Sequence, residues 1–385
     1  MTHFTHRLLG SLQVTVCIGS IGAFAADPTL PDTAAPPDRP GMRLVWSEEF
    51  AKDGAPDGAV WNFEKGFARN EELQWYQSQN AVCKGGLLRI EGRKERVANP
   101  NYASGSSSWK TNRQYAEYTS SSLSSSGKKQ FQYGKWEVRA RLDGQAGSWP
   151  AIWTLGASGE WPTNGEVDLM EFYPNSGAPA LHANVAWGTA TRWSAKWSSK
   201  VRSLSSFTSK DPDWLKKFHV WTMDWNVDTV KLSLDGEVLN TTLTSQTINA
   251  DGTNPYRDRP QYMMLNLALG SNGGDPSKGS FPMVYEVDYV RVYQKGTNGV
   301  LPGEPTRESG LRAERTGDAL RFWLPTAGAF QARVLDLSGR TVRERKVVGS
   351  RGGEQVLGLA GSGRQILILM LGGPQGDWRT LLPPR

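Results

Sequence analysis

The stretch Tyr133-Gly-Lys-Trp136-Glu-Val138-Arg-Ala140-Arg-Leu142 alternates apolar and polar side chains. A period of two indicates a β-strand with one face in the core and one in water. The same alternation recurs in Val230-Lys-Leu232-Ser-Leu234 and in Tyr285-Glu-Val287-Asp-Tyr289-Val-Arg-Val-Tyr293. Helical periodicity is scarce from Met42 to Tyr293, so the sequence predicts an all-β domain.

The number of such segments indicates the architecture. About 250 residues of short strands are too many for a small barrel and favour a β-jelly-roll sandwich of two antiparallel sheets. We expect this domain to span residues 42–295. A Gly- and Pro-rich linker at 296–305 precedes a small C-terminal β-sandwich at 306–385.

The N-terminus has the pattern of an export signal. A weakly basic start is followed by the mostly apolar run Leu8–Ala25, and Ala23-Phe-Ala25 fits a cleavage site. Residues 1–25 are therefore predicted to be a signal peptide, and the Pro-rich residues 26–41 an extended linker. We expect a secreted or cell-surface protein without a membrane span.

Charge and cysteine content restrict the chemistry. The tail from Thr306 onward carries twelve Arg and one Lys against seven acids, which accounts for the whole net charge of +6. The rest is nearly neutral, which argues against a nucleic-acid partner and suits an uncharged substrate. After leader removal Cys83 is the only cysteine, so neither a disulfide nor a zinc cluster is expected. Any catalysis must rest on carboxylates, and that chemistry needs no cofactor.

A group of acids occurs in Glu166-Val-Asp168-Leu-Met-Glu171. In a regular strand Glu166 and Asp168 share a face, but Glu171 points to the other side. A one-residue bulge at Leu169-Met170 would bring Glu171 to the same face. Three neighbouring carboxyls cannot all ionise easily, so one would have a raised pKa and act as an acid, and another would stay ionised and act as a nucleophile. Asp168 would couple the two.

The alternative is a solvated strand face that carries its acids without a function. Trp149-Pro-Ala-Ile-Trp153 and Trp161-Pro162 lie just upstream, and sugar rings stack on aromatic side chains. A tryptophan-lined groove with a few polar groups is typical of a polysaccharide site. Core packing remains the other interpretation of each tryptophan.

The chain resembles glycoside hydrolase family 16, particularly its laminarinase-like branch with the bulged E-x-D-x-x-E motif. The resemblance covers roughly Leu44 to Tyr293. Seven blocks occur in the family's order: Trp46-Ser-Glu-Glu-Phe50, Asn70-Glu-Glu-Leu-Gln-Trp-Tyr76, Tyr133-Gly-Lys-Trp-Glu-Val-Arg139, Trp149-Pro-Ala-Ile-Trp153, Gly165-Glu-Val-Asp-Leu-Met-Glu171, Leu265-Asn-Leu-Ala-Leu-Gly270 and Val287-Asp-Tyr-Val-Arg-Val-Tyr293.

The resemblance implies a concave cleft and retaining endo-hydrolysis of β-1,3- or mixed-linkage β-1,3-1,4-glucan. It implies Glu166 as nucleophile, Glu171 as acid/base and Asp168 as their assistant. Alternatives within the family are action on agar or carrageenan, and transglycosylation. The alternative from another class is a non-catalytic glucan-binding protein, and such relatives lack the acid row.

By position in the family, further residues are expected to bind substrate. Each has a structural alternative: Asn70 could make a turn, Arg139 could pair with a neighbouring acid, and His182 could be a core histidine. The stretch Leu181-His-Ala-Asn-Val-Ala-Trp187 differs from the family's paired-histidine pattern, which leaves the exact substrate open. The candidates are Asn70, Arg139, Trp149, Trp153, Trp161, His182, Asn184 and Trp187.

Two further expectations come from the resemblance. Many relatives hold a structural calcium ion away from the cleft, and Glu49 and Asp288 match the places of its acidic ligands; the alternative is two exposed strand acids. The tail faintly resembles C-terminal sorting domains through Val334-Leu-Asp-Leu-Ser-Gly-Arg340, which implies a secretion apparatus as partner. The competing interpretation is a carbohydrate-binding module, with Trp323 and Trp378 stacking on sugar. The protein is expected to be a monomer.

Overall fold

The computed structural model describes residues 27–295 and, in the C-terminal part, 313–316, 319–324, 328–336, 341–349, 353–359, 367–373 and 376–382. The predicted signal peptide and the 296–305 linker lie outside the described residues. Within the described part, no helix is long and apolar enough to cross a membrane. The chain forms two compact units, residues up to 35 with 47–291, and residues 36–46 with 292 onward, each considered by itself.

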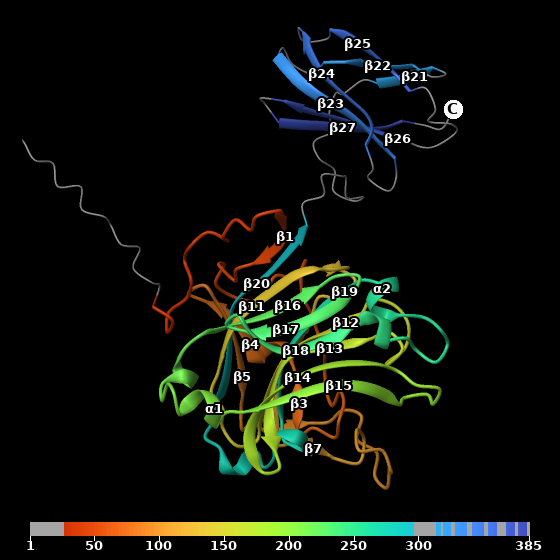
Figure 1. Cartoon of the computed structure of the whole chain (residues 1–385). Coiled ribbons are helices and arrows are strands. Elements are labelled where there is room, and N and C mark those ends of the chain that lie inside the picture. The colour runs from red at the N-terminus through yellow and green to blue at the C-terminus, as the bar shows by residue number, and fades with distance from the viewer. Residues whose placement is uncertain are drawn as a thin grey trace, which may run out of the picture. The chain divides into compact units, whose positions relative to one another are not determined.

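Two antiparallel sheets dominate residues 27–295, as predicted for a jelly roll (Figure 1). Val138 and Leu232 are fully buried, and so is Val287, because alternate residues of each strand face the core between the sheets. The first sheet contains, in order, β18 (Glu237–Leu243), β17 (Thr229–Leu234), β16 (His219–Trp225), β11 (Gly134–Leu142), β20 (Met283–Lys295), β5 (Leu87–Gly92) and β4 (Ala81–Lys84), with β1 (Met42–Glu48) also paired to β20.

The second sheet supplies the functional face. Its long central strands are shown side by side in Figure 1. It contains, in order, β15 (Ala195–Ser203), β14 (Ala178–Gly188), β13 (Glu166–Asn175), β12 (Ser148–Gly156), β19 (Gln261–Leu269), β9 (Ser122–Ser124) and β2 (Asn62–Phe63), with β10 (Gln130–Phe131) also paired to β19.

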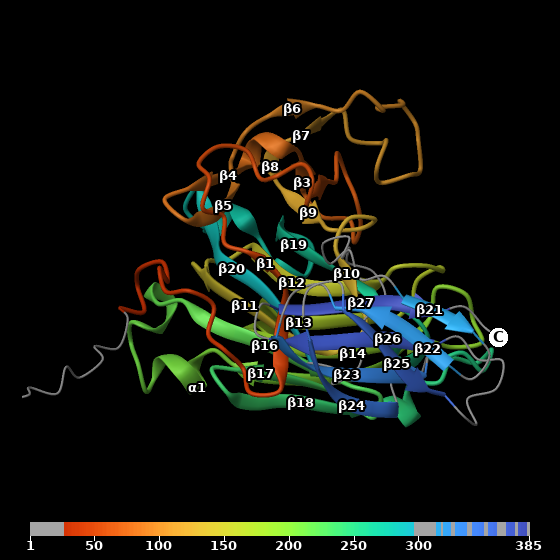
Figure 2. The same ribbon diagram turned by 90° about the horizontal axis from the view of Figure 1, so that it is seen from above.

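Short elements connect these sheets. Figure 2 shows the small strands β3, β6, β7 and β8 near β4 and β5. They form the pairs β3 (Gln74–Tyr76) with β8 (Tyr118–Ser120) and β6 (Val97–Ala98) with β7 (Tyr115–Ala116). The helices are α1 (Ser205–Thr208), α2 (Pro255–Asp258) and the 3-10 turns η1 (Ser78–Asn80), η2 (Trp214–Lys216), η3 (Thr244–Gln246), η4 (Ser271–Gly273) and η5 (Pro276–Lys278).

The C-terminal strands form the predicted small β-sandwich. Two sheets enclose one apolar core that includes Leu320, Phe322, Val334 and Leu369. One sheet contains β21 (Ala313–Thr316), β22 (Ala319–Trp323) and β25 (Glu354–Gly358); the other contains β24 (Thr341–Gly349), β23 (Gly328–Asp336), β26 (Leu367–Gly373) and β27 (Gly376–Leu382).

The segment before β1 differs from the predicted extended linker. The amide of Asp32 donates to Asp288 Oδ2 at 3.0 Å, and the amide of Phe218 donates to the Pro28 carbonyl at 2.7 Å. The guanidinium of Arg139 donates to the Leu30 carbonyl at 3.0 Å. Low apolar content predicted a linker, but this segment is held to the domain by backbone hydrogen bonds, which composition does not reveal.

Candidate active site

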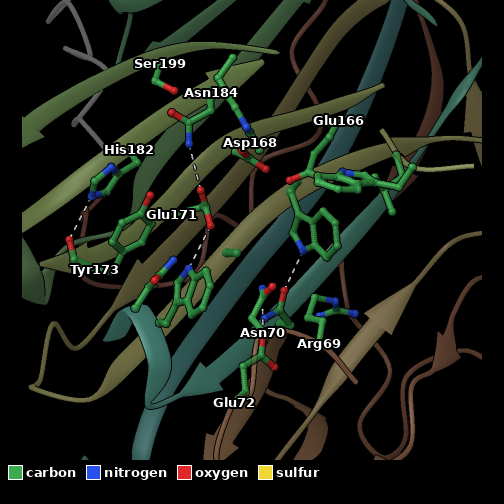
Figure 3. A pocket seen from close by; sticks show the side chains of 18 of the residues that line it. Arg69, Asn70, Glu72, Glu166, Asp168, Glu171, Tyr173, His182, Asn184 and Ser199 are labelled. Carbon is green, nitrogen blue, oxygen red and sulfur yellow. Dashed lines mark hydrogen bonds between the residues drawn. The ribbon is translucent and has the colours of Figure 1, made fainter. Parts of the chain in front are cut away.

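The row of acids on β13 owes its geometry to a bulge. Asp168 pairs with Asn184 and Glu171 pairs with His182 on β14, so two residues of β13 lie opposite the single residue between them. The register to β12 shifts at the same place. The predicted bulge at Leu169-Met170 is therefore present, and Glu166, Asp168 and Glu171 converge on one cavity (Figure 3).

The backbone at Glu166 is fixed from both sides. Gly165 has φ +80°, and a Cβ there would lie 2.7 Å from Pro255, so the chain needs glycine at this turn. The buried hydroxyl of Tyr256 accepts a hydrogen bond from the Glu166 amide at 3.1 Å and donates to the Glu166 carbonyl at 2.7 Å. These contacts hold the first acid in place at the start of β13.

The acids lie in a cleft of about 760 Å³ on the second sheet. Aromatic and amide side chains make up much of its wall, as a sugar site requires. The lining residues include Arg69, Asn70, Glu72, Trp149, Trp153, Trp161, Tyr173, Asn175, His182, Asn184, Trp193, Trp197, Ser199, Asn266 and Asn272.

Neutral donors orient the two outer acids. Trp161 Nε1 donates to Glu166 Oε2 at 2.6 Å. Trp149 Nε1 donates to Glu171 Oε1 at 3.0 Å, and Asn184 Nδ2 donates to Glu171 Oε2 at 3.0 Å. Each glutamate is thus fixed while the cavity stays open in front of it (Figure 3).

The three acids have different pKa shifts. Burial, with the charge of Glu166, raises the pKa of Glu171 to about 7. Burial and the two neighbouring glutamates raise the pKa of Asp168 well above its usual range, which favours its protonated form. Burial also raises the pKa of Glu166, but hydrogen bonds from Trp161 and Asp168 and the charge of Arg69 oppose that rise. Glu166 is therefore the acid whose anion receives most support.

One end of the cleft is formed by the loop before β3, which contains Arg69, Asn70 and Glu72 (Figure 3). Arg69 forms an ion pair with Glu64 and lies 5.0 Å from the ring centre of Trp153. Asn70, with φ 54°, contacts Glu72 through a weak hydrogen bond of 3.5 Å. The predicted cleft residue Asn70 is thus present at the cavity, and it also makes the turn given as its alternative.

An aromatic stack lies at Glu171. The rings of Tyr173 and His182 are stacked 3.6 Å apart, and Trp149 meets Tyr173 edge-on at 5.5 Å. Burial lowers the pKa of His182, so its imidazole is neutral at neutral pH, and its Nε2 lies 3.1 Å from the Tyr173 carbonyl. His182 lines the cleft and supports the ring that contacts Trp149.

Two predicted substrate residues lie elsewhere. Arg139 is on β11 of the other sheet, where it forms an ion pair with Asp288, and it does not line the cavity. Trp187 is buried but also absent from the lining. Because side chains alternate along β14, His182 and Asn184 face the cleft and Trp187 faces the opposite side. The prediction that Arg139 and Trp187 bind substrate in the cleft is therefore wrong: one residue is on the other sheet, and the other is on the far face of β14.

The carboxylates of Glu49 and Asp288 do not fit a shared calcium site. Glu49 accepts two hydrogen bonds from Arg291, at 2.8 and 2.9 Å. Asp288 is engaged by Arg139 and by the Asp32 amide. A guanidinium at each carboxylate repels a divalent cation and occupies its oxygens. In the described part of the chain, no group of three or more His, Cys, Asp or Glu side chains is placed to hold a metal ion.

Several lining residues were missed by sequence reasoning. Arg69 immediately precedes the family motif that begins at Asn70, so the motif did not include it. Trp193 lies in the turn before β15, and Trp197 lies near the start of that strand. The strand's sequence, Ala195-Lys-Trp-Ser-Ser-Lys-Val-Arg-Ser203, is too polar to stand out as a strand. Its alternation, with Trp197 and Val201 on one face, was the available signal.

The model of the glycosyl hydrolases family 16 matches residues 71–291, which include the acid row and most of both sheets. The chain belongs to this family. It is therefore a glycoside hydrolase, and its sequence resembles endo-acting glucanases. A beta-glucanase of Rhodothermus marinus is 32% identical over 274 residues, covering 66% of this chain and 86% of that protein.

Solved structures of glycan-degrading enzymes are also similar to this chain. The laminarinase catalytic domain of Thermotoga petrophila is 30% identical, with a TM-score of 0.54, covering 66% of this chain and 98% of that one. A structure from work on endo-acting O-glycanases of the human gut microbiota is also 30% identical, with a TM-score of 0.61 and coverage of 68% and 94%. Structures similar to this chain thus come from work on enzymes with different substrates.

Proposed function

We propose that the chain is a retaining endo-β-glucanase that hydrolyses β-1,3- or mixed-linkage β-1,3-1,4-glucan. The observation that carries the proposal is the charge of the cleft. Among the described residues that line it, Arg69 is the only Arg or Lys, and Glu64 neutralises it. Four acids line the cleft, and the three on β13 surround the reactive position. Such a cleft suits an uncharged polysaccharide and repels a sulfated one.

In this mechanism Glu166 attacks the anomeric carbon while Glu171 protonates the leaving oxygen. Asp168 supplies a hydrogen bond to Glu166 that stabilises its anion, because the raised pKa of Asp168 favours its protonated form. The nucleophile must also be oriented toward the anomeric carbon. Trp161 orients the Glu166 carboxylate through its 2.6 Å hydrogen bond.

The second step follows from the coupling of the two glutamates. Formation of the glycosyl-enzyme removes the negative charge of Glu166, which is one cause of the raised pKa of Glu171. The pKa of Glu171 then falls, and the carboxylate it becomes takes a proton from water. Water attacks the anomeric carbon and restores Glu166.

The substrate class is supported by the relatives' names as well as by the cleft. The beta-glucanase and laminarinase relatives match over most of their own length, which favours glucan over agar or carrageenan. A non-catalytic glucan-binding function is disfavoured because three crowded acids on one strand face, one of them buried and two half-buried, are costly unless they take part in catalysis. Hydrolysis and transglycosylation share these residues.

Product analysis on laminarin, lichenan, agarose and carrageenan tests the proposal, with Glu166→Gln assayed alongside. We expect oligosaccharides from laminarin or lichenan, initial products of the β-anomer by NMR, and no products with Glu166→Gln. Cleavage of agarose or carrageenan alone would refute the substrate. Wild-type rates with Glu166→Gln would refute the nucleophile.

We also propose that the protein is exported and that its C-terminal β-sandwich has an accessory function, either in secretion or in carbohydrate binding. Deletion of residues 306–385 separates the two. Loss of the enzyme from the medium supports secretion, and loss of adhesion to insoluble glucan supports binding.

A further inference from the structure

Two exposed tryptophans lie on the wall of the cleft without a role in the steps above. Trp193 and Trp197 are 55% and 45% exposed, and both line the cavity. In the described part of the chain they are the only tryptophans among the exposed large apolar side chains; Trp61, Trp136 and Trp221, for example, are fully buried. Exposure of two indole rings has a free-energy cost that a ligand could remove.

The turn that carries Trp193 is held in a defined conformation. Trp193 has φ 63°, which a bulky side chain rarely adopts. Arg192 forms two hydrogen bonds with Glu160, at 2.7 and 2.9 Å, and its guanidinium carbon lies 5.0 Å from the Trp193 ring centre. This exposed ion pair contributes little to stability, but it shows that the turn lies beside Glu160.

A second set of hydrogen bonds connects the turn between β14 and β15 with the loop between β12 and β13. Asn249 accepts from the Gly188 amide at 2.6 Å and donates to the Thr163 carbonyl at 2.8 Å. Trp161, which orients Glu166, lies between Glu160 and Thr163 on the loop so tied. The turn with Trp193 is thus fixed relative to the catalytic acids.

Strand register places Trp197 relative to the reaction. Trp197 pairs with Ala186, and Ala186 pairs with Glu166, so the three residues form one row across β15, β14 and β13. Two strand spacings put Trp197 about 10 Å from the nucleophile's strand. Ser199, also on β15, lies across the acids from Arg69, Asn70 and Glu72 (Figure 3). The two tryptophans therefore belong to the end of the cleft opposite the Arg69 loop.

We propose that Trp193 and Trp197 form a stacking platform for glucosyl residues that lie beyond the reactive position, at the β15 end of the cleft. The inference rests on the proposed glucanase function. All ring hydroxyls of a β-glucosyl residue are equatorial, so both ring faces expose C–H groups that pack on indole. A galactosyl ring carries an axial hydroxyl on one face, so only its other face packs on an indole in this way. The platform therefore favours long glucan chains over short ones.

Chain-length dependence of hydrolysis tests the platform. We expect the kcat/KM of a Trp193→Ala/Trp197→Ala variant to fall more for longer β-glucan oligosaccharides, with a loss of at least about fivefold for the longest. A Trp193→Tyr/Trp197→Tyr variant keeps two rings and should recover most of the loss. Val227→Ala, an exposed apolar side chain in the turn between β16 and β17, is the matched control. An equal loss at every chain length would overturn the platform.

A binding measurement separates this inference from the proposed function. Glu166→Gln, with and without the two alanine substitutions, is run in native gels containing laminarin, lichenan or agarose. Retardation by laminarin or lichenan that the alanine substitutions abolish supports the platform, even if the wild-type enzyme hydrolyses neither glucan. Equal retardation of both proteins, or no retardation by either glucan, overturns it.

Discussion

The two large sheets both carry charged side chains at alternate positions, but they balance these charges in opposite ways. On β11 and β20, Arg139 pairs with Asp288 and Arg141 pairs with Glu286. On β13, among the described residues, no arginine forms an ion pair with Glu166, Asp168 or Glu171. The donors to the two glutamates from outside this row are tryptophans and an asparagine.

The difference teaches how one strand pattern serves two purposes. Paired charges satisfy each other and hold the segment around Asp32 to the sheet. Crowded acids raise each other's pKa and leave one of them, Glu171, with a pKa of about 7. The ion pairs on β11 and β20 contribute to stability. The crowded acids on β13 lower stability but provide the acid and the nucleophile that catalysis needs.

The largest expected effect is on activity. Glu166→Gln removes the nucleophile, and kcat should fall at least about a thousandfold. The same change in the paired sheet, Glu286→Gln, should leave kcat within about twofold, because Glu286 contacts Arg141 and not the cleft. Steady-state kinetics on soluble glucan measures both. A similar fall in kcat for the two variants would contradict the distinction between a catalytic sheet and a structural one.

Removing an acid from the paired sheet should instead lower stability. Asp288→Ala leaves the buried guanidinium of Arg139 without its counterion and the Asp32 amide without its acceptor. We expect the free energy of unfolding to fall by about 3 kcal/mol, measured by urea denaturation. An unchanged midpoint would mean that the pair is not a structural element.

Removing an acid from the cleft should raise stability. The folded-state pKa of Glu171 is about 7, against an ordinary value of 4.5. The folded state therefore binds the proton more tightly, and the resulting stabilisation is full below about pH 4.5 and is lost as the pH rises through 7. Glu171→Gln should be more stable than wild type by about 1–3 kcal/mol at pH 8, with a smaller difference at pH 4. Denaturation curves at the two pH values check this, and a destabilised variant at pH 8 would contradict it.

The smallest effect is on the pH profile. Glu171 must be protonated to act as the acid, so kcat/KM should decline above about pH 7. The hydrogen bond from Trp149 lowers the pKa of Glu171. Trp149→Phe removes it, so the decline should move to higher pH by less than about one unit. A shift to lower pH would reverse the assigned effect of this hydrogen bond.

Strand alternation predicted much of the fold and the acid row. The period of β11 and β20 indicated two-faced strands, and the misfit of Glu171 to that period predicted the bulge. Alternation also explains one error, because Trp187 is at an odd position from Asn184 on β14. The other error has a different cause, because Arg139 belongs to the other sheet. Periodicity assigns a face within a strand, but it does not say which sheet the strand joins.

Other features depend on contacts that no local pattern contains. Arg69 gains its place only when the loop before β3 meets Trp153 of β12. The pairing of Glu49 with Arg291 joins residues 242 positions apart, so the expected calcium ligands could not be recognised as ion-paired from the sequence. Such long-range partners decide whether an acid is free to bind a cation.

Trapping of the covalent intermediate tests the central claim most directly. A 2-deoxy-2-fluoro β-laminaribiosyl fluoride slows hydrolysis of the glycosyl-enzyme, and peptide mass spectrometry then locates the attached sugar. The account predicts one laminaribiosyl unit on the Glu166 carboxylate, with none after Glu166→Gln. Attachment to Asp168 or Glu171 would contradict the assignment of the acids on β13.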